Sequence, residues 1–528
     1  MKKIIFLLIL NPFFVFAQAP TIEWDKTIGG AGLDNCVQII QTSDGGYVAI
    51  GHSDSDISFD KTHNALNADY WIIKINALGN IIWQKNYGGI EEDFPVRILE
   101  TKDSGFLVTG TSDSPISGDN TCGPITISFP PEQYTWLLKL DSLGEISWQK
   151  AVNAVAISQL LQTTNNQYII AGTKWTNPPG WGTEDYYLSK LDILGNTIWE
   201  KTVLADNTDY FGNIILANDG GYIVGGASRS SANLDKTEGP IGPPDVYGIY
   251  STDIWILKIS ENGQIVWQNT IGGDGYEGVT CIKSNGNNSY TLVGGTTSPV
   301  SGDKTLPMID TNDFWVIDID NMGNVIGQSS FGFGANYNQL TNIIQYIDKD
   351  EDGNFMIFGF KNWQTTNSQI YLKKVNPLGN LLWEKVIDGN SRDRIDSVAK
   401  TSDGGYILGC SSDSSISGDK TESARDFSED YWIIKLSPDN LSSISLQKNV
   451  YQVFPNPTSG NINIKFGQVL EKATLTLANV LGQVVANKTV NNLEYTTFEI
   501  NDEPDGIYFL EIVSHQNARQ VMKIIKQN

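Results

Sequence analysis

Histidine, cysteine, basic residues and long apolar runs are all scarce in this chain of 528 residues. Three histidines leave little material for histidine-based catalysis or for a zinc site. The 60 acidic residues outnumber the 36 basic ones and give a net charge of −24, which argues against a nucleic-acid partner. Beyond the first residues, no apolar run reaches the roughly 20 residues that span a bilayer, so we expect no transmembrane helix.

The four cysteines, Cys36, Cys122, Cys281 and Cys410, are too few and too scattered for a disulfide framework. Their spacing fits no metal site either. Buried free thiols are the favoured interpretation, and one disulfide pair is the alternative.

The first 17 residues have the pattern of a signal peptide. Two lysines after Met1 precede a short apolar run, and Val15 and Ala17 are the small residues expected before a cleavage point. We predict cleavage between Ala17 and Gln18 and export of the mature chain. No cysteine follows that point, so lipid attachment there is not supported.

One stretch, Asp69–Gly89, sets the plan of the chain. Two β-type runs flank Asn76–Gly79, where Gly79 supplies the positive φ of a tight hairpin. The chain contains seven copies of this stretch, the first included, at intervals of about 60 residues. The copies contain Trp71, Trp136, Tyr187, Trp255, Trp315, Tyr371 and Trp432. Each copy follows a strand opened by a turn such as that at Asp44, and a further apolar run precedes this strand. Four strands per repeat predict an all-β, seven-bladed β-propeller over residues 18–445.

The fourth strand of each repeat carries a W-x-K pattern, as at Trp83. The seventh repeat lacks such a strand after Ser437, whereas an unmatched copy lies at Trp24. We therefore predict that the amino-terminal strand completes the last blade. The recurring tryptophan is expected to pack between neighbouring sheets. Gly327 replaces it in the fifth repeat, where Phe331 or Phe333 is expected to fill the gap.

Residues 446–528 lack the repeat and read as six or seven short strands of an Ig-like antiparallel sandwich. Four motifs follow in order: VFPNPTSG from Val453, LANVLGQVV from Leu477, DGIYFLEIV from Asp505 and a terminal KIIK. Together they resemble the C-terminal sorting domain of type IX secretion cargo in Bacteroidetes. The matching positions are Pro455, Asn456, Pro457, Gly460, Gly482, Gly506 and Tyr508. The resemblance implies the type IX secretion machinery as a partner and a final location outside the cell or on its surface. A passive Ig-like spacer is the alternative.

The loops between the second and third strands of each repeat are long and variable, so they and the neighbouring blade junctions form the candidate binding face. The junctions are acidic, as at Glu91–Asp93. Five of the loops share a fragment, at Asp60, Gly118, Asp235, Gly302 and Gly418, that reads DKT or GDNT. This fragment could cap a turn through its aspartate and threonine, which we favour, or bind a ligand.

Two further patterns suggest ligands. Trp175 and Trp181 lie on a loop rich in proline and glycine, where they could stack on sugar rings or anchor the loop. Asp348, Asp350 and Asp352 have the D-x-D-x-D-G spacing of a calcium loop, although Gly359 stands where an EF-hand requires glutamate. A solvated acidic turn is the alternative interpretation of these aspartates.

The expected function is that of a secreted or cell-surface binding module for a glycan or a protein. No catalytic residue is assigned, and calcium is the one candidate cofactor. The alternative is a secreted polysaccharide-degrading enzyme that uses acidic residues of the long-loop face.

Overall fold

The computed structural model describes residues 19–123, 133–153, 155–176, 183–286, 288–332, 342–350, 352–361, 368–439, 452–479, 483–514 and 519–527. These residues form two compact units, Ala19–Pro438 and Asp439–Asn528. Within the described ranges the chain is almost entirely β-strand, with one short 3₁₀ turn at Arg425–Phe427. A search of the same ranges finds no helix with the length and apolar character needed to cross a membrane.

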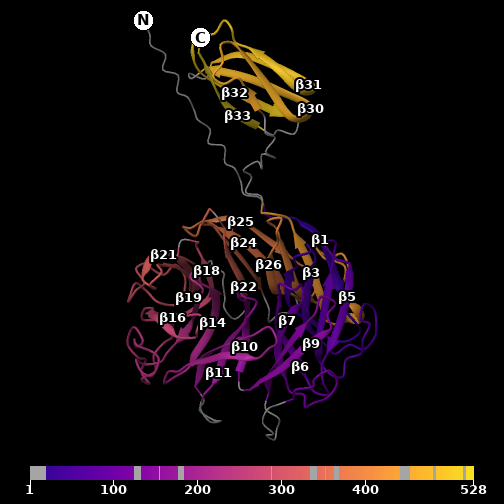
Figure 1. The fold of residues 1–528 in the computed structure, drawn as a ribbon, viewed down its shortest axis with the longest axis vertical. Helices are drawn as coiled ribbons and strands as arrows, with labels where there is room; N and C mark the ends of the chain where they lie inside the picture. Colours follow the sequence, from indigo (N-terminus) through magenta and orange to yellow (C-terminus); the bar gives the residue numbers. More distant parts are fainter. Residues whose placement is uncertain are drawn as a thin grey trace. The chain divides into compact units, whose positions relative to one another are not determined.

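The described part of the first unit contains seven four-stranded antiparallel sheets, numbered here in chain order (Figure 1). Sheet one is β2 (Asp34–Gln41), β3 (Tyr47–Ser53), β4 (Asp69–Ile75) and β5 (Ile81–Tyr87). Sheet two is β6 (Asp93–Glu100), β7 (Phe106–Ser112), β8 (Tyr134–Leu140) and β9 (Ile146–Asn153). Sheet three is β10 (Val155–Gln162), β11 (Tyr168–Trp175), β12 (Glu184–Leu191) and β13 (Thr197–Val203). Sheet four is β14 (Asp209–Leu216), β15 (Tyr222–Ser228), β16 (Asp253–Ile259) and β17 (Ile265–Ile271).

The remaining three sheets follow the same order of strands. Sheet five is β18 (Glu277–Ser284), β19 (Tyr290–Thr296), β20 (Asp313–Ile319) and β21 (Val325–Gly332). Sheet six is β22 (Asn342–Lys349), β23 (Phe355–Lys361), β24 (Gln369–Val375) and β25 (Leu381–Ile387). Sheet seven is β26 (Asp393–Lys400), β27 (Tyr406–Ser412), β28 (Asp430–Leu436) and, from the start of the chain, β1 (Ile22–Ile28). The first strands of neighbouring sheets contact one another, including β26 with β2, which gives the unit a propeller-like fold.

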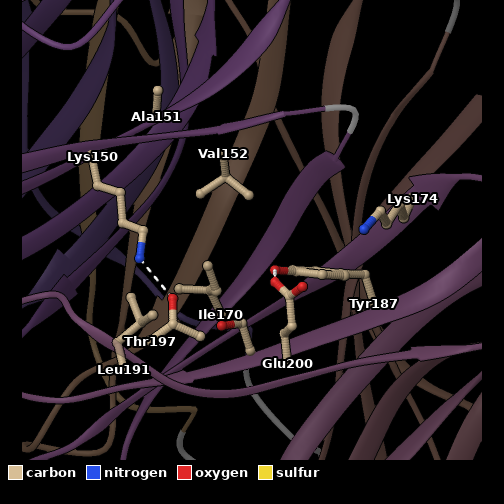
Figure 2. Close-up of a pocket in the computed structure, with 10 residues that line it drawn as sticks. Lys150, Ala151, Val152, Ile170, Lys174, Tyr187, Leu191, Thr197 and Glu200 are labelled. Atoms are coloured by element: carbon tan, nitrogen blue, oxygen red, sulfur yellow. Dashed lines mark hydrogen bonds between the residues drawn. The ribbon is translucent and has the colours of Figure 1, made fainter. Parts of the chain in front are cut away.

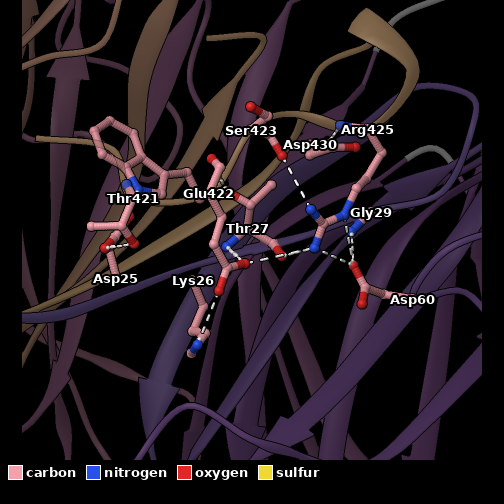
Figure 3. Close-up of polar contacts among 11 residues, drawn as sticks. Asp25, Lys26, Thr27, Gly29, Asp60, Thr421, Glu422, Ser423, Arg425 and Asp430 are labelled. Carbon is pink, nitrogen blue, oxygen red and sulfur yellow. Dashed lines mark hydrogen bonds and ion pairs between the residues drawn. The ribbon is translucent and has the colours of Figure 1, made fainter. Parts of the chain in front are cut away.

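The predicted pairing of the amino-terminal strand is confirmed, because β1 runs antiparallel to β28 with Thr27 opposite Trp432. Polar contacts reinforce this seam (Figure 3). Asp25 accepts hydrogen bonds from the Trp432 indole nitrogen at 2.9 Å and from both the backbone and the hydroxyl of Thr421 at 3.0 and 2.6 Å. Sheet seven is therefore built from both ends of the unit.

The third strand of each sheet is buried along most of its length, and its centre is largely apolar. In β4 and β28 every residue is buried, and the residues from Tyr70 to Ile73 and from Tyr431 to Ile434 form apolar runs with no polar–apolar alternation. The fourth strand is half-exposed at the outer edge. The first strand of every sheet carries a register shift near its middle, as between Cys36 and Gln38 in β2. This repeated irregularity is a β-bulge, which increases the local twist of the innermost strand.

The recurring tryptophan of the fourth strand packs between neighbouring sheets, as predicted, and its ring contacts the hairpin glycine of the next sheet. Gly79, which has φ +80°, lies against the Trp24 ring so closely that an added Cβ would meet ring carbons 3.1 and 3.2 Å away. Five such contacts join sheets in succession: Trp24 with Gly79, Trp83 with Gly144, Trp148 with Gly195, Trp199 with Gly263 and Trp267 with Gly323. The Trp199 indole also donates to the Glu261 carbonyl at 2.9 Å. The contact between a fourth-strand tryptophan and the hairpin glycine of the following sheet is thus repeated from sheet to sheet.

Phe331 replaces the missing tryptophan of sheet five. Phe331 is 1% exposed. It lies so close to Gly379, the hairpin glycine of sheet six, that a Cβ added to this glycine would be 2.7 Å from the Phe331 Cβ. Its ring packs between Phe314 and Phe355, with centroids 5.2 and 5.0 Å away. The prediction that a phenylalanine fills the gap left by Gly327 is confirmed for Phe331, whereas Phe333 lies outside the described residues.

The second unit contains five described strands rather than the six or seven predicted: β29 (Gln452–Phe454), β30 (Asn461–Asn479), β31 (Val484–Glu499), β32 (Gly506–Ser514) and β33 (Arg519–Lys526). The prediction was wrong because two pairs of short runs join into long strands. β30 and β31 pair along most of their lengths, and a register shift takes the place of the expected turn. Their core contains Ile462, Leu475, Leu510 and Ile524.

All four cysteines are free thiols, so the single-disulfide alternative is wrong. Cys36 and Cys410 are buried, and burial raises the pKa of both thiols well above its usual value. These two side chains therefore act as small core residues.

Candidate ligand-binding face

The long loops and the sheet junctions meet at one face, as the sequence predicted. The first residue of a sheet donates its backbone N–H to the end of the preceding sheet's long loop. Examples are Asp93 to Ala68 and Glu277 to Thr252, both at 2.7 Å. Each loop is thereby held by the sheet that follows it.

The repeated DKT fragment is a structural anchor in the described loops. The Lys61 side chain is 1% exposed, and its ammonium nitrogen lies 4.9 Å from the centre of the Trp71 ring. Lys236 and Lys420 lie over Trp255 and Trp432 at 5.1 and 4.8 Å. These buried lysines are turned away from solvent, which supports the turn-stabilising interpretation over direct ligand binding.

The aspartate and threonine of the fragment complete this anchor. The Asp60 backbone N–H donates to the Gly29 carbonyl at 3.1 Å, so the loop of sheet one grips the junction before it. The Thr62 N–H donates to Gln84, and Gln84 also accepts the Trp71 indole N–H at 3.1 Å. Lysine, tryptophan and glutamine therefore form one linked set within a sheet.

Sheets three and six, which lack the DKT fragment, use a different set. Tyr187 and Tyr371 replace the tryptophan, and the covering lysines, Lys174 and Lys361, come from the ends of the second strands. In sheet three the Tyr187 hydroxyl donates to Glu200 at 3.0 Å, where sheets one, two, four and five have glutamine. The sequence analysis missed this exchange, although it can be read from the repeats once they are aligned strand by strand.

Tyrosine fills less volume than tryptophan, and a cavity of about 200 Å³ lies beside Tyr187 (Figure 2). Lys150, Lys174 and Glu200 line it together with apolar groups such as Val152 and Ile170. Burial lowers the pKa of Lys150, which donates to Thr197 at 2.8 Å. The cavity mixes charged and apolar groups and could hold a small polar molecule.

The acidic residues that begin the strands at the junctions are buried, which limits their use as surface ligands. Asp93 accepts the Gly89 N–H at 2.7 Å, and Glu277 accepts the Gly273 N–H at 2.9 Å. Burial raises the pKa of Asp209 and of Asp253 to about 7. The exposed junction acids are instead Glu91, Glu92, Asp206 and Asp274.

The exposed tips of the anchored loops carry aliphatic residues. Ile57, Ile116, Val300 and Ile416 occupy the same place in their loops, four residues before the buried Lys or Asn, and are 62%, 69%, 59% and 66% exposed. The serine that follows each of them is fixed, and Ser58, for example, accepts the Ala31 N–H at 2.8 Å. Apolar groups on preorganised loops are typical of a binding surface.

Of the predicted stacking pair, Trp175 ends β11 opposite Glu184 and is 48% exposed. Trp181 lies outside the described residues. The pair as a sugar-binding platform therefore stays a prediction.

The predicted calcium residues have lysine partners. Asp348 pairs with Lys283 at 2.9 Å, and Asp350 pairs with Lys374 at 2.7 Å and accepts the Asn354 N–H at 2.8 Å. Asp352 is exposed in the turn. Among the described residues no cluster of three or more acidic, histidine or cysteine side chains could hold a metal ion. Calcium binding at these aspartates stays a prediction.

A second hollow, of about 380 Å³, lies along the first strands of sheets one to three. Gln38, Arg97, Glu100 and Gln159 are among its lining residues. Burial lowers the pKa of Arg97, whose guanidinium donates to the Val96 carbonyl at 2.9 Å. The remaining donors of this guanidinium could bind a carboxylate or another anion.

In the second unit, several predicted motif residues tie the first strands to the last. Asn456 donates to the Lys523 carbonyl at 2.7 Å and accepts the Ile525 N–H at 2.8 Å. Gly460 leaves no room for a side chain, since an added Cβ would lie 1.9 Å from Asn501. The buried Tyr508 donates to the Pro504 carbonyl at 2.6 Å.

The other predicted motif residues have less distinct roles in the structure. Pro455 and Pro457 are exposed, and an added Cβ at Gly506 would meet nothing within 4 Å. Gly482 and the predicted cleavage residues Ala17 and Gln18 lie outside the described residues.

Residues 452–527 match the family described as the secretion system C-terminal sorting domain. No curated protein matches the chain. Solved structures similar to this chain include the Dos1 propeller (11% identity, 79% of this chain and 96% of that chain covered, TM-score 0.36). The WD40 domain of Neurospora crassa Pan2 is similar at 9% identity (79% and 95% covered, TM-score 0.38). A protein of unknown function from Dyadobacter fermentans is similar at 10% identity (79% and 99% covered, TM-score 0.37).

The chain thus belongs to the class of exported proteins that carry a propeller-like unit ahead of a sorting tail. More narrowly, it is type IX secretion cargo: its C-terminal sorting domain directs it through the type IX machinery to the cell surface or the extracellular space.

Proposed function

We propose that this protein is an extracellular binding module that holds a protein ligand on its long-loop face. The observation that carries the proposal is the set of exposed aliphatic residues at equivalent loop positions, Ile57, Ile116, Val300 and Ile416. Each of these loops is fixed at its base by a buried lysine or asparagine, so little conformational entropy would be lost on binding.

The proposal includes a seven-bladed ring over residues 18–445, with a signal peptide at residues 1–17 and an Ig-like sorting domain at residues 446–528. The pairing of β1 with β28 and the contact between β26 and β2 support the ring. Radial repetition of short sheets leaves only short edges, which suits a protein that works outside the cell.

Charge indicates the kind of protein ligand. Glu91, Glu92, Asp206 and Asp274 are exposed at the junctions, whereas the lysines of the DKT fragments are buried. A ligand with a basic surface around an apolar patch would complement this face. A glycan ligand is the second candidate, favoured by the exposed ring of Trp175. The enzyme alternative has less support, because the acidic residues that begin the strands are buried and therefore out of reach of a polysaccharide at the surface.

A screen of immobilised protein against extracellular proteins and a glycan array tests this function. In one variant Ile57, Ile116, Val300 and Ile416 are changed to serine. A matched control variant changes four exposed leucines of the hairpins between third and fourth strands, Leu78, Leu143, Leu194 and Leu378, which are 69%, 66%, 68% and 79% exposed. We expect the loop variant to lose ligand that the wild type and the control retain. Equal retention by the two variants would remove the long-loop face from consideration.

A further inference from the structure

A buried lysine, an asparagine amide and a buried carboxyl group meet at the edge of sheet one. The Lys61 ammonium nitrogen lies 2.9 Å from Oδ1 of Asn86, on the fourth strand. Nδ2 of the same amide lies 2.7 Å from Oδ2 of Asp69, the first residue of the third strand. Lys61 and Asp69 are each 1% exposed, and Asn86 between them is half-buried.

The chemistry of the neighbours fixes the orientation of the Asn86 amide. A lysine only donates hydrogen bonds, so the amide oxygen must face Lys61. The two acceptors on the other side, Asp69 and the Asn64 carbonyl at 3.4 Å, require the amide nitrogen. The lysine nitrogen therefore lies against the carbonyl oxygen of the amide, and the carboxyl group lies against the nitrogen that would leave in an acyl transfer.

Among the described residues, this arrangement occurs in sheet one alone. The residue opposite the third-strand tryptophan or tyrosine is an amide in sheet one alone. The equivalents of Asn86 in sheets two to seven are Ala151, Thr202, Thr270, Ser330, Val386 and Thr27. The buried lysine is common to several sheets and has a packing role, whereas its acyl partner is specific to sheet one.

The protonation states suit nucleophilic attack. Burial lowers the pKa of Lys61 to about 8, which leaves an appreciable fraction of free amine near neutral pH. Burial raises the pKa of Asp69 to about 6, and its Oδ1 atom has no hydrogen-bond partner among the described residues. Asp69 can therefore both accept and give up a proton at this site.

We propose that Lys61 and Asn86 become joined by an intramolecular isopeptide bond, with Asp69 as the catalytic acid and base. The neutral amine of Lys61 attacks Cγ of Asn86, and the Nζ–Cγ bond forms. Asp69 takes a proton from the attacking nitrogen and gives one to Nδ2. The Cγ–Nδ2 bond then breaks and one molecule of ammonia leaves. No oxidant, metal or other reactant is needed.

The position of the bond gives it a structural use. Asp60, the residue before Lys61, pairs with Arg425 of sheet seven at 3.0 Å, and its backbone N–H donates to the Gly29 carbonyl beside the seam (Figure 3). An isopeptide bond from Lys61 to β5 would covalently fix this loop where sheets seven and one meet. Such a link would oppose opening of the seam outside the cell.

The test is peptide mapping by mass spectrometry of the full mature chain. We expect a branched peptide that joins the Lys61 and Asn86 segments and weighs less than their sum by one ammonia. An amino-terminal Gln18 also loses ammonia when it cyclises, so the branched peptide is the deciding observation rather than the intact mass. Linear peptides containing unmodified Lys61 and Asn86 in the wild type would overturn the proposal.

Two variants and one internal control complete the experiment. Asn86→Thr introduces the residue that Thr270 provides in sheet four, so it should fold and give only linear peptides. Asp69→Asn keeps an acceptor for the amide but removes the acid, and should also leave the peptides linear. A branched peptide that persists in Asp69→Asn would overturn the role of Asp69. Lys236, which has Thr270 in place of an amide, should be linear throughout.

Discussion

Replacement of Asp25 by alanine tests whether the amino-terminal strand holds sheet seven together. Asp25 lies on β1 and is 5% exposed. Its carboxylate accepts the indole N–H of the fully buried Trp432 at 2.9 Å and the backbone N–H of Thr421 at 3.0 Å. In Asp25→Ala the indole N–H would remain buried without an acceptor, whereas Thr421 is exposed and its N–H could bond to water.

The expected loss follows from the orphaned indole donor. An unsatisfied buried donor costs about 1–3 kcal/mol in the free energy of unfolding. The entropy of unfolding is about 2.1 cal/mol/K per residue, so a unit of this size loses about 1 °C of melting temperature per kcal/mol. We expect the melting temperature to fall by about 1–3 °C.

The repeats supply a matched control, Asp25→Gln. Gln84, Gln149, Gln268 and Gln328 occupy this position in sheets one, two, four and five, and each accepts the same tryptophan indole. Glutamine removes the charge but restores the acceptor, so this variant should melt within about 1 °C of the wild type. Scanning calorimetry measures all three proteins. If Asp25→Ala melted like the wild type, or Asp25→Gln like Asp25→Ala, the reasoning about the seam would be wrong.

Four further predictions address other parts of the chain. Phe331→Ile introduces the residue that three other sheets have at the equivalent position. Because Gly327 leaves the neighbouring space empty, this variant should lose about 2 kcal/mol in the free energy of unfolding, which urea titration would measure. Burial raises the pKa of Asp430 to about 8, so the folded state binds more protons than the unfolded state between about pH 4 and 8. The protonated Asp430 carboxyl group therefore favours the folded state at low pH, and this stabilisation is lost as pH rises through that window. Asp430→Asn should reduce the fall in melting temperature between pH 5 and pH 8; an unchanged fall would refute that role. Deletion of residues 452–527 should leave the protein inside the cell envelope, as shown by immunoblots of cell and medium fractions. If calcium binds at Asp352, calcium should raise the melting temperature of the wild type but not of Asp352→Asn, and equal responses would exclude this site.

The repeat made much of the fold predictable. Four strands per period, the unmatched Trp24 strand and the missing partner of the seventh repeat were enough to pair β1 with the end of the unit. The glycine of the hairpin was also predictable, because a tight turn between two β runs requires a positive φ at Gly79. These features depend on local sequence and on counting.

The sequence by itself determined the repeat, the strand order and the sorting motif, since each is a pattern along the chain. Only the tertiary structure decided what the polar residues do. The aspartates of the junctions and the lysines of the DKT fragments read as surface groups, yet both are buried by neighbouring strands from distant parts of the chain. The contact of Lys61 with Asn86 and Asp69 depends on the register between β4 and β5, which spacing alone does not give. Burial then sets the protonation of these groups, because removing water penalises their charged forms.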